Sequence, residues 1–263
     1  MSNPDDLPRT PMSRLLEEIS WDGRSVSKYR DGGRGKENVL TAEVLTALDY
    51  LPRDAYLANV LRHAHGPSAA AELAAAEAEA AEIIFLPEEI ALNPAAKSGS
   101  QLIVQPDATI TSPSTVVLLE AKAIRAGTFG PEQLAREYLA VTAMAGRRTP
   151  LLLLVLGTPP PVKIRGGRVR LDVTDAILAN LEDIYRRAAP HPWSLGELRQ
   201  RVAACYAWLT WTELAELVIA EHALGRHSGT FAAGTVDRLV DTIERAVKWH
   251  GGHSDSRSPS RDR

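Results

Sequence analysis

The chain has 263 residues, of which 44% are hydrophobic and 24% are charged, with a formal net charge of -3. This composition is typical of a globular protein with one large domain, or one domain and a small satellite. The longest apolar run, 151–156, is too short to span a membrane, and the N-terminus has no apolar leader, so we expect a cytoplasmic protein that does not bind a membrane. The single cysteine, Cys205, excludes an internal disulfide and a zinc site built from several cysteines.

The first third of the chain is predicted to be an N-terminal arm, 1–24, followed by a basic, glycine-rich stretch and then helices. The basic stretch ends at Lys36. Apolar residues at helical spacing predict a helix over 37–51, which Pro52 ends. Residues 54–82 are predicted to form a helical insertion, and its alanine-rich part, 68–82, is expected to be a peripheral helix with a thin contact stripe.

The middle of the chain changes to a strand pattern. Strands are predicted over 83–86, 101–110 and 115–124, followed by a helix over 130–145 and a buried strand over 151–156. The order helix, three strands, helix, strand defines an α/β domain over 25–175. It ends in a hairpin within 162–173, where Gly166 and Gly167 predict a two-residue turn.

The last part of the chain is predicted to be helical. Helices over 175–187, 195–209, 213–224 and 236–249 form a C-terminal helical subdomain, 176–250, ahead of a disordered tail, 251–263. Within 194–250 the Lys and Arg residues do not outnumber the acidic residues, which disfavours a DNA-reading helix-turn-helix. We expect these helices to serve assembly, as the surface for a homodimer or for a protein partner.

Three charged residues mark two neighbouring strands. Asp107 begins one strand, and Glu120 and Lys122 lie two residues apart on the next, which places the latter two on the same face. Charges at the end of an apolar strand are costly unless they are paired or bind an ion. Two converging carboxylates, helped by a backbone carbonyl, form an all-oxygen site that suits Mg²⁺, with Mn²⁺ expected to substitute. Lys122 can then orient a water or stabilise negative charge during phosphodiester attack.

These residues and the order of the elements, over about 36–157, resemble the PD-(D/E)XK nuclease superfamily. The resemblance implies a restriction-endonuclease-like fold, with a central mixed sheet flanked by helices, and Mg²⁺-dependent hydrolysis of phosphodiester bonds, expected in DNA. Asp107, Glu120 and the Ala121 carbonyl would hold the metal, and Lys122 would position the attacking water. Two alternatives are a catalytically inactive nucleic-acid- or protein-binding module with this fold, and an α/β scaffold in which the motif is coincidental.

The resemblance also implies a further acid from the first helix, where Glu37 and Glu43 compete. At 100° per residue Glu37 falls on the apolar face and Glu43 at its edge, so we choose Glu37 to orient a second metal or a metal-bound water. The alternative for Glu37 is a favourable position at the positive end of the helix dipole.

The helix over 130–145 carries Gln133 and Tyr138, similar to a Gln and Tyr near the metal in superfamily members that resemble recombination and repair nucleases. Their usual spacing is one residue shorter. We expect Gln133 to hydrogen-bond the substrate phosphate, the alternative being a surface residue, and for Tyr138 the alternative is packing.

The hairpin supplies a basic face. A two-residue turn pairs Arg165 with Arg168 and Lys163 with Arg170, and places Val162, Ile164, Val169 and Leu171 on the other face. Like charges in cross-strand pairs destabilise a hairpin, and an anionic partner would remove that cost. Protection of an exposed edge is the alternative. The cations that we expect to bind nucleic acid are Arg30, Arg34, Lys36, Lys163, Arg165, Arg168 and Arg170.

Overall fold

The computed structural model describes residues 35–66, 69–92, 101–125, 127–167, 169–188, 191–228 and 234–252. The predicted arm 1–24, Arg30, Arg34 and Arg168 lie outside the described residues, as does the predicted tail from residue 253 onward. Lys36 and Glu37 belong to a described helix, but their side chains lie outside the description.

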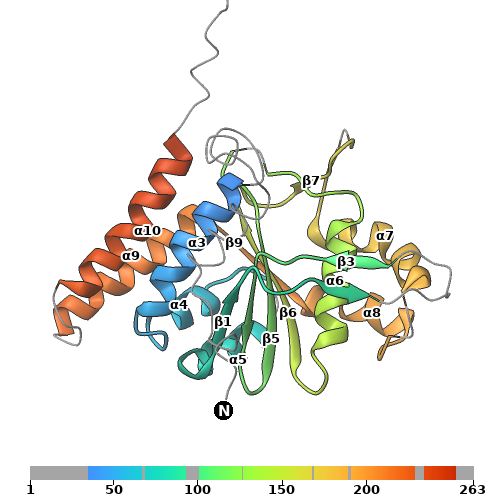
Figure 1. The fold of residues 1–263 in the computed structure, drawn as a ribbon, viewed down its shortest axis with the longest axis horizontal. Helices are drawn as coiled ribbons and strands as arrows, with labels where there is room; N and C mark the ends of the chain where they lie inside the picture. The colour runs from blue at the N-terminus through green and yellow to red at the C-terminus, as the bar shows by residue number, and fades with distance from the viewer. Residues whose placement is uncertain are drawn as a thin grey trace, which may run out of the picture.

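A mixed five-stranded sheet forms the centre of the molecule (Figure 1). The strands lie in the order β1 (Glu82–Phe85), β4 (Ala108–Thr111), β5 (Thr115–Ala121), β6 (Thr149–Leu156) and β9 (Tyr206–Thr210). The first three are antiparallel neighbours, whereas β5, β6 and β9 run parallel. Two small antiparallel pairs lie outside this sheet: β2 (Ile90–Leu92) with β3 (Leu102–Val104), and β7 (Val162–Lys163) with β8 (Arg170–Leu171).

Helices cover both faces of the sheet, which confirms the predicted α/β class (Figure 1). One face carries α3 (Gly35–Tyr50), α4 (Tyr56–Arg62), α5 (Ala69–Ala76), η2 (Ala78–Ala80), α9 (Trp211–Ser228) and α10 (Thr235–Gly252). The other face carries α6 (Gln133–Met144), α7 (Val173–Arg187), α8 (Leu195–Arg201) and η3 (Val202–Ala204).

The central strands β5 and β6 each contain a continuous apolar run because both of their faces are covered. Val117 and Leu119 of β5 belong to the cluster under α3 and α4, whereas Val116 and Leu118 belong to the cluster under α6 and α7. Every residue of β5 is buried. A continuous apolar run is therefore the pattern that this strand requires.

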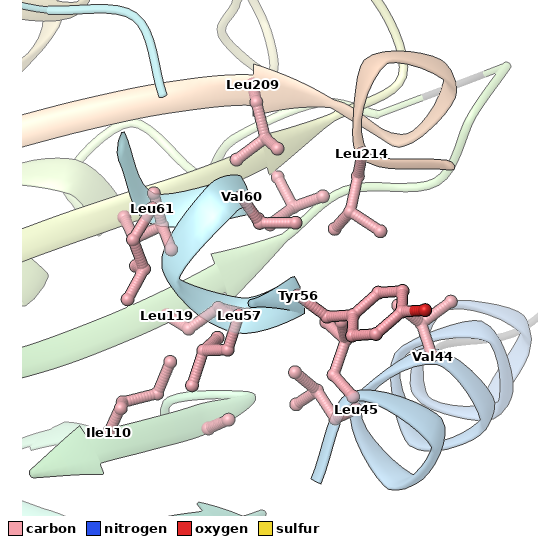
Figure 2. Packing of buried hydrophobic residues seen from close by; sticks show 14 of the residues in the cluster. Val44, Leu45, Tyr56, Leu57, Val60, Leu61, Ile110, Leu119, Leu209 and Leu214 are labelled. Atoms are coloured by element: carbon pink, nitrogen blue, oxygen red, sulfur yellow. The ribbon is translucent and has the colours of Figure 1, made fainter. Parts of the chain in front are cut away.

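Figure 2 shows the packing between α3, α4 and the sheet. The predicted apolar face of α3 is confirmed, since Leu40, Val44 and Leu48 are all buried. The helical segment predicted over 54–82 contributes to this core, because Tyr56 and Leu57 of α4 are fully buried in the same cluster. Small side chains let α5 approach closely, and its buried residues are Ala70, Ala71, Ala74 and Ala75.

Two predicted elements differ from the structure. The helix expected over 195–209 ends at Arg201, and residues 206–210 form β9, so the region 176–250 contains a strand of the central sheet. A short apolar run is compatible with a helix or a strand. Here residues 206–210 form a strand because β6 on one side and His65 on the other supply backbone partners. The strand expected over 101–110 is divided into β3 and β4, which belong to different sheets, and Pro106 lies between them.

The chain segments that follow β5 and β6 approach each other at Gly157. A Cβ atom at this position would lie 2.2 Å from the carbonyl oxygen of Ile124 and 2.5 Å from that of Ala123. Both neighbours are backbone atoms, so the contact cannot be relieved by rotating a side chain.

We expect Gly157→Ala to destabilise the fold by roughly 1–3 kcal/mol, the usual cost of overpacking, in denaturant titration. Gly196→Ala is the matched control, because its Cβ would meet only Ser194 Oγ at 3.9 Å in the first turn of α8. The control should be neutral or stabilising by about 0.5–1 kcal/mol. Equal stability of the two variants would contradict the close approach of these segments.

Candidate active site

Asp107 and Glu120 converge at the ends of β4 and β5. The antiparallel register pairs Ala108 with Leu119, so Asp107 lies opposite Glu120 one step further along. Asp107 Oδ2 accepts a hydrogen bond of 2.7 Å from the Ala121 N–H, and its carbonyl accepts one of 2.8 Å from the Leu86 N–H. Backbone hydrogen bonds from two strand ends therefore fix the position of Asp107.

Lys122 lies beside Glu120, as the period of two predicts. Glu120 is 3% exposed and Lys122 is 8% exposed, and the ammonium pairs with Glu120 Oε1. The same ammonium lies 4.9 Å from the centre of the Phe129 ring. On the backbone, the Lys122 N–H donates to the Val155 carbonyl, and its carbonyl accepts from Trp211 Nε1, each at 2.8 Å. Strand β6 and the start of α9 thus hold Lys122 in place.

Gln133, the first residue of α6, contacts this pair directly. Its Nε2 donates to Glu120 Oε1 at 2.5 Å and to Glu137 Oε1 at 2.7 Å, and its Oε1 accepts from the Gly130 N–H at 3.1 Å. Gln133 is half-buried and bonded to two carboxylates, whereas its contact with a substrate phosphate stays a prediction. Tyr138 packs instead of reaching the site, because its hydroxyl donates to the Leu198 carbonyl at 2.8 Å. At 100° per residue, Tyr138 lies about 140° around the helix from Gln133.

Sequence reasoning missed Glu137. Its side chain is 3% exposed, and Oε2 has no hydrogen-bond partner among the described residues. Burial is the main cause that raises the pKa of Glu137 well above its usual range, and the nearby Glu120 carboxylate raises it further, while Lys122 lowers it in part. The i, i+4 spacing from Gln133 was a signal for this contact, since such residues share one helix face.

We expect Glu137→Gln to stabilise the metal-free protein increasingly as the pH rises from about 4.5 toward neutrality. The folded chain keeps the Glu137 proton over an interval in which the unfolded chain has lost it, so unfolding releases a proton and the wild type loses stability with rising pH. The glutamine does not titrate and keeps an acceptor for Gln133. Denaturant titrations in chelator at several pH values measure the difference. A difference that is constant with pH would show that Glu137 ionises normally in the folded chain.

The acid from the first helix remains a prediction. Glu37 lies in the first turn of α3, but its side chain lies outside the described residues. Glu43, the competing residue, faces α10, where its Oε2 lies 3.9 Å from His250 Nε2, and burial raises the pKa of Glu43. Glu43 therefore lies where α3 packs against α10, two helices that run side by side (Figure 1).

The site offers donors of the chemical type that Mg²⁺ prefers. Asp107 and Glu120 supply carboxylate oxygens, and the adjacent Ala121 carbonyl is a further hard oxygen. Within the part of the chain that the structure describes, no group of three or more His, Cys, Asp or Glu could hold a metal ion. The side chain of Glu37, the predicted further acid, lies outside the described residues.

The hairpin lies beside the candidate site. Lys163 pairs with Arg170 as predicted, and both side chains are exposed, as is Arg165. The predicted apolar face is only partly formed, because Val169 is 71% exposed. The β7–β8 pairing is short because the first strand of the hairpin also pairs with Phe129. The Phe129 N–H donates to the Lys163 carbonyl at 2.9 Å, and the Phe129 carbonyl accepts from the Arg165 N–H at 2.8 Å. These bonds fasten the hairpin to the segment beneath Lys122.

Comparisons with known proteins give no relative: no protein-family model, no curated protein and no solved structure matches this chain. Among the described helices, none combines the length and the apolar character needed to cross a membrane. The case for a function therefore rests on the geometry of the site.

Proposed function

We propose that the chain is a metal-dependent nuclease of the PD-(D/E)XK type, which hydrolyses phosphodiester bonds and has DNA as its expected substrate. The observation that carries the proposal is the convergence of Asp107, Glu120 and Lys122 at the ends of two adjacent strands. The mixed sheet with helices on both faces is compatible with a restriction-endonuclease-like core.

The oxygen donors of the site favour a cation. Asp107 and Glu120 lie opposite each other in the register of β4 and β5, so both carboxylates come from the same strand ends. Carboxylate oxygens are the ligands that Mg²⁺ prefers. Mg²⁺ bound there would neutralise charge on the scissile phosphate and lower the pKa of a bound water. Asp107, Glu120 and the Ala121 carbonyl would hold it.

The remaining residues position groups around that centre. The Lys122 ammonium has three donors, and beside Glu120 it can orient the attacking water toward the phosphate. Both amide hydrogens of Gln133 are engaged, one by Glu120 and one by Glu137. Gln133 would therefore act first by holding Glu120, and a contact with the substrate phosphate would require one of these bonds to break.

Asp107→Asn and Glu120→Gln should each lower metal-dependent cleavage of DNA by at least about 10³-fold, a loss typical of removing essential transition-state stabilisation. The far-ultraviolet circular dichroism spectrum should be unchanged. Glu132→Gln is the control, because Glu132 directly precedes Gln133 but is half-buried and pairs with Arg187 instead of the site. Full activity of either site variant would refute the nuclease assignment. Binding of DNA by the wild type without cleavage would favour the inactive binding module.

Lys122→Ala should lower turnover by about 10²–10⁴-fold, the range for a group that assists proton transfer, and leave the affinity for Mn²⁺ nearly unchanged. The reason is that an ammonium cannot ligate a metal ion. Calorimetry measures the affinity and single-turnover cleavage measures the rate. Loss of Mn²⁺ binding with intact turnover would show that Lys122 has a different role.

Replacing Lys163, Arg165, Arg168 and Arg170 together with Gln should weaken nucleic-acid binding for all sequences. If each cation contacts one phosphate, the slope of log K against log salt should fall by about 3 to 4 units. Four exposed cations elsewhere, Arg186, Arg199, Arg245 and Lys248, give the control variant. An unchanged slope in the hairpin variant would place the substrate elsewhere and leave edge protection as the explanation for these cations.

A further inference from the structure

A basic pocket of about 240 Å³ opens next to Lys122. Three segments form its wall: the residues after β5, the residues after β6, and the hairpin of β7 and β8. Among the described residues, its charged lining is entirely cationic and consists of Lys122, Arg125, Lys163 and Arg170. This basic pocket is thus a separate compartment that shares one residue with the acidic site.

Close backbone packing gives the pocket a defined wall. Gly127 has room for no side chain, since its Cβ would lie 2.7 Å from Lys122 Cβ, and Gly157 closes against the backbone of Ala123 and Ile124. The hydrogen bonds of Phe129 to the hairpin join the third segment to the first. The cations therefore surround a hollow that the fold itself shapes.

The positive charge of the pocket favours an anion that carries more than one negative charge. Glu120 offsets Lys122, whereas Arg125, Lys163 and Arg170 leave three positive charges, and two of these face each other across the hairpin. A phosphate inside a nucleic-acid strand carries one negative charge, while a terminal phosphate carries roughly -1.5 to -2 at pH 7 and offers three acceptor oxygens. A terminal phosphate therefore matches the positive charge of the pocket better than a phosphate inside a strand does.

We propose that the basic pocket binds the terminal phosphate of a nucleic-acid strand and that the protein recognises phosphorylated strand ends. The inference rests on the proposed function, because Lys122 borders both compartments and an end held in the pocket would lie beside the metal site. Arg125, which no motif in the sequence had singled out, becomes a residue that determines specificity.

Fluorescence anisotropy in metal-free buffer tests the pocket without requiring cleavage. The probes are three short oligonucleotides of one sequence, with a 5′-phosphate, with a 3′-phosphate, or with hydroxyls at both ends. One phosphorylated probe should bind at least tenfold more tightly than the hydroxyl probe, and the preferred end gives the polarity. Arg125→Gln should bring that ratio close to one, while Arg186→Gln, an exposed cation of α7, should leave it unchanged.

Equal binding of the three probes by the wild type would overturn the proposal, as would an unchanged ratio in Arg125→Gln. If a covalently closed circle is cleaved as fast as a phosphorylated linear molecule, the proposed end recognition is wrong and the nuclease assignment stands. If the protein prefers phosphorylated ends but cleaves no substrate, the pocket proposal stands and the nuclease assignment is wrong. Inorganic phosphate that competes with every probe equally would show that the pocket binds a free anion instead of a strand end.

Discussion

The arrangement of the site depends on one constraint, which is that two carboxylates and one ammonium are held together at the ends of two apolar strands. Buried charges of this kind are destabilising unless each has partners. Here the partners come from different parts of the chain: the Ala121 backbone supports Asp107, and Gln133 and Lys122 support Glu120. The geometry of the site is thus a consequence of the strand register and of where α6 begins.

The rest of the fold makes that constraint rigid. Strands β5 and β6 are covered on both faces, so their ends cannot shift without disturbing two hydrophobic clusters. Trp211, at the start of α9, fixes the Lys122 carbonyl through the hydrogen bond from its Nε1. A site mounted on buried strands is positioned more accurately than one on loops, as the proposed metal-dependent reaction would require. The hairpin is exposed and short, and in our proposal it contacts the nucleic acid.

The sequence predicted what depends on local periods and missed what depends on tertiary neighbours. The period of two placed Glu120 beside Lys122, and helical spacing predicted the buried face of α3. The prediction that residues 206–209 end a helix was wrong, because a short apolar segment becomes a strand when a neighbour such as β6 pairs with it. Glu137 was missed for a related reason: a carboxyl on a helix is usually solvated, and only the packing of α6 onto the sheet buries it.

The central claim is the proposal that Asp107 and Glu120 together hold a divalent cation beside Lys122. Calorimetric titration of the full chain with Mn²⁺, in wild type and in the double variant Asp107→Asn with Glu120→Gln, tests it most directly. The account predicts saturable, stoichiometric binding by the wild type and no specific binding by the double variant. Wild-type protein that binds no Mn²⁺, or a double variant that binds it equally well, would contradict the account.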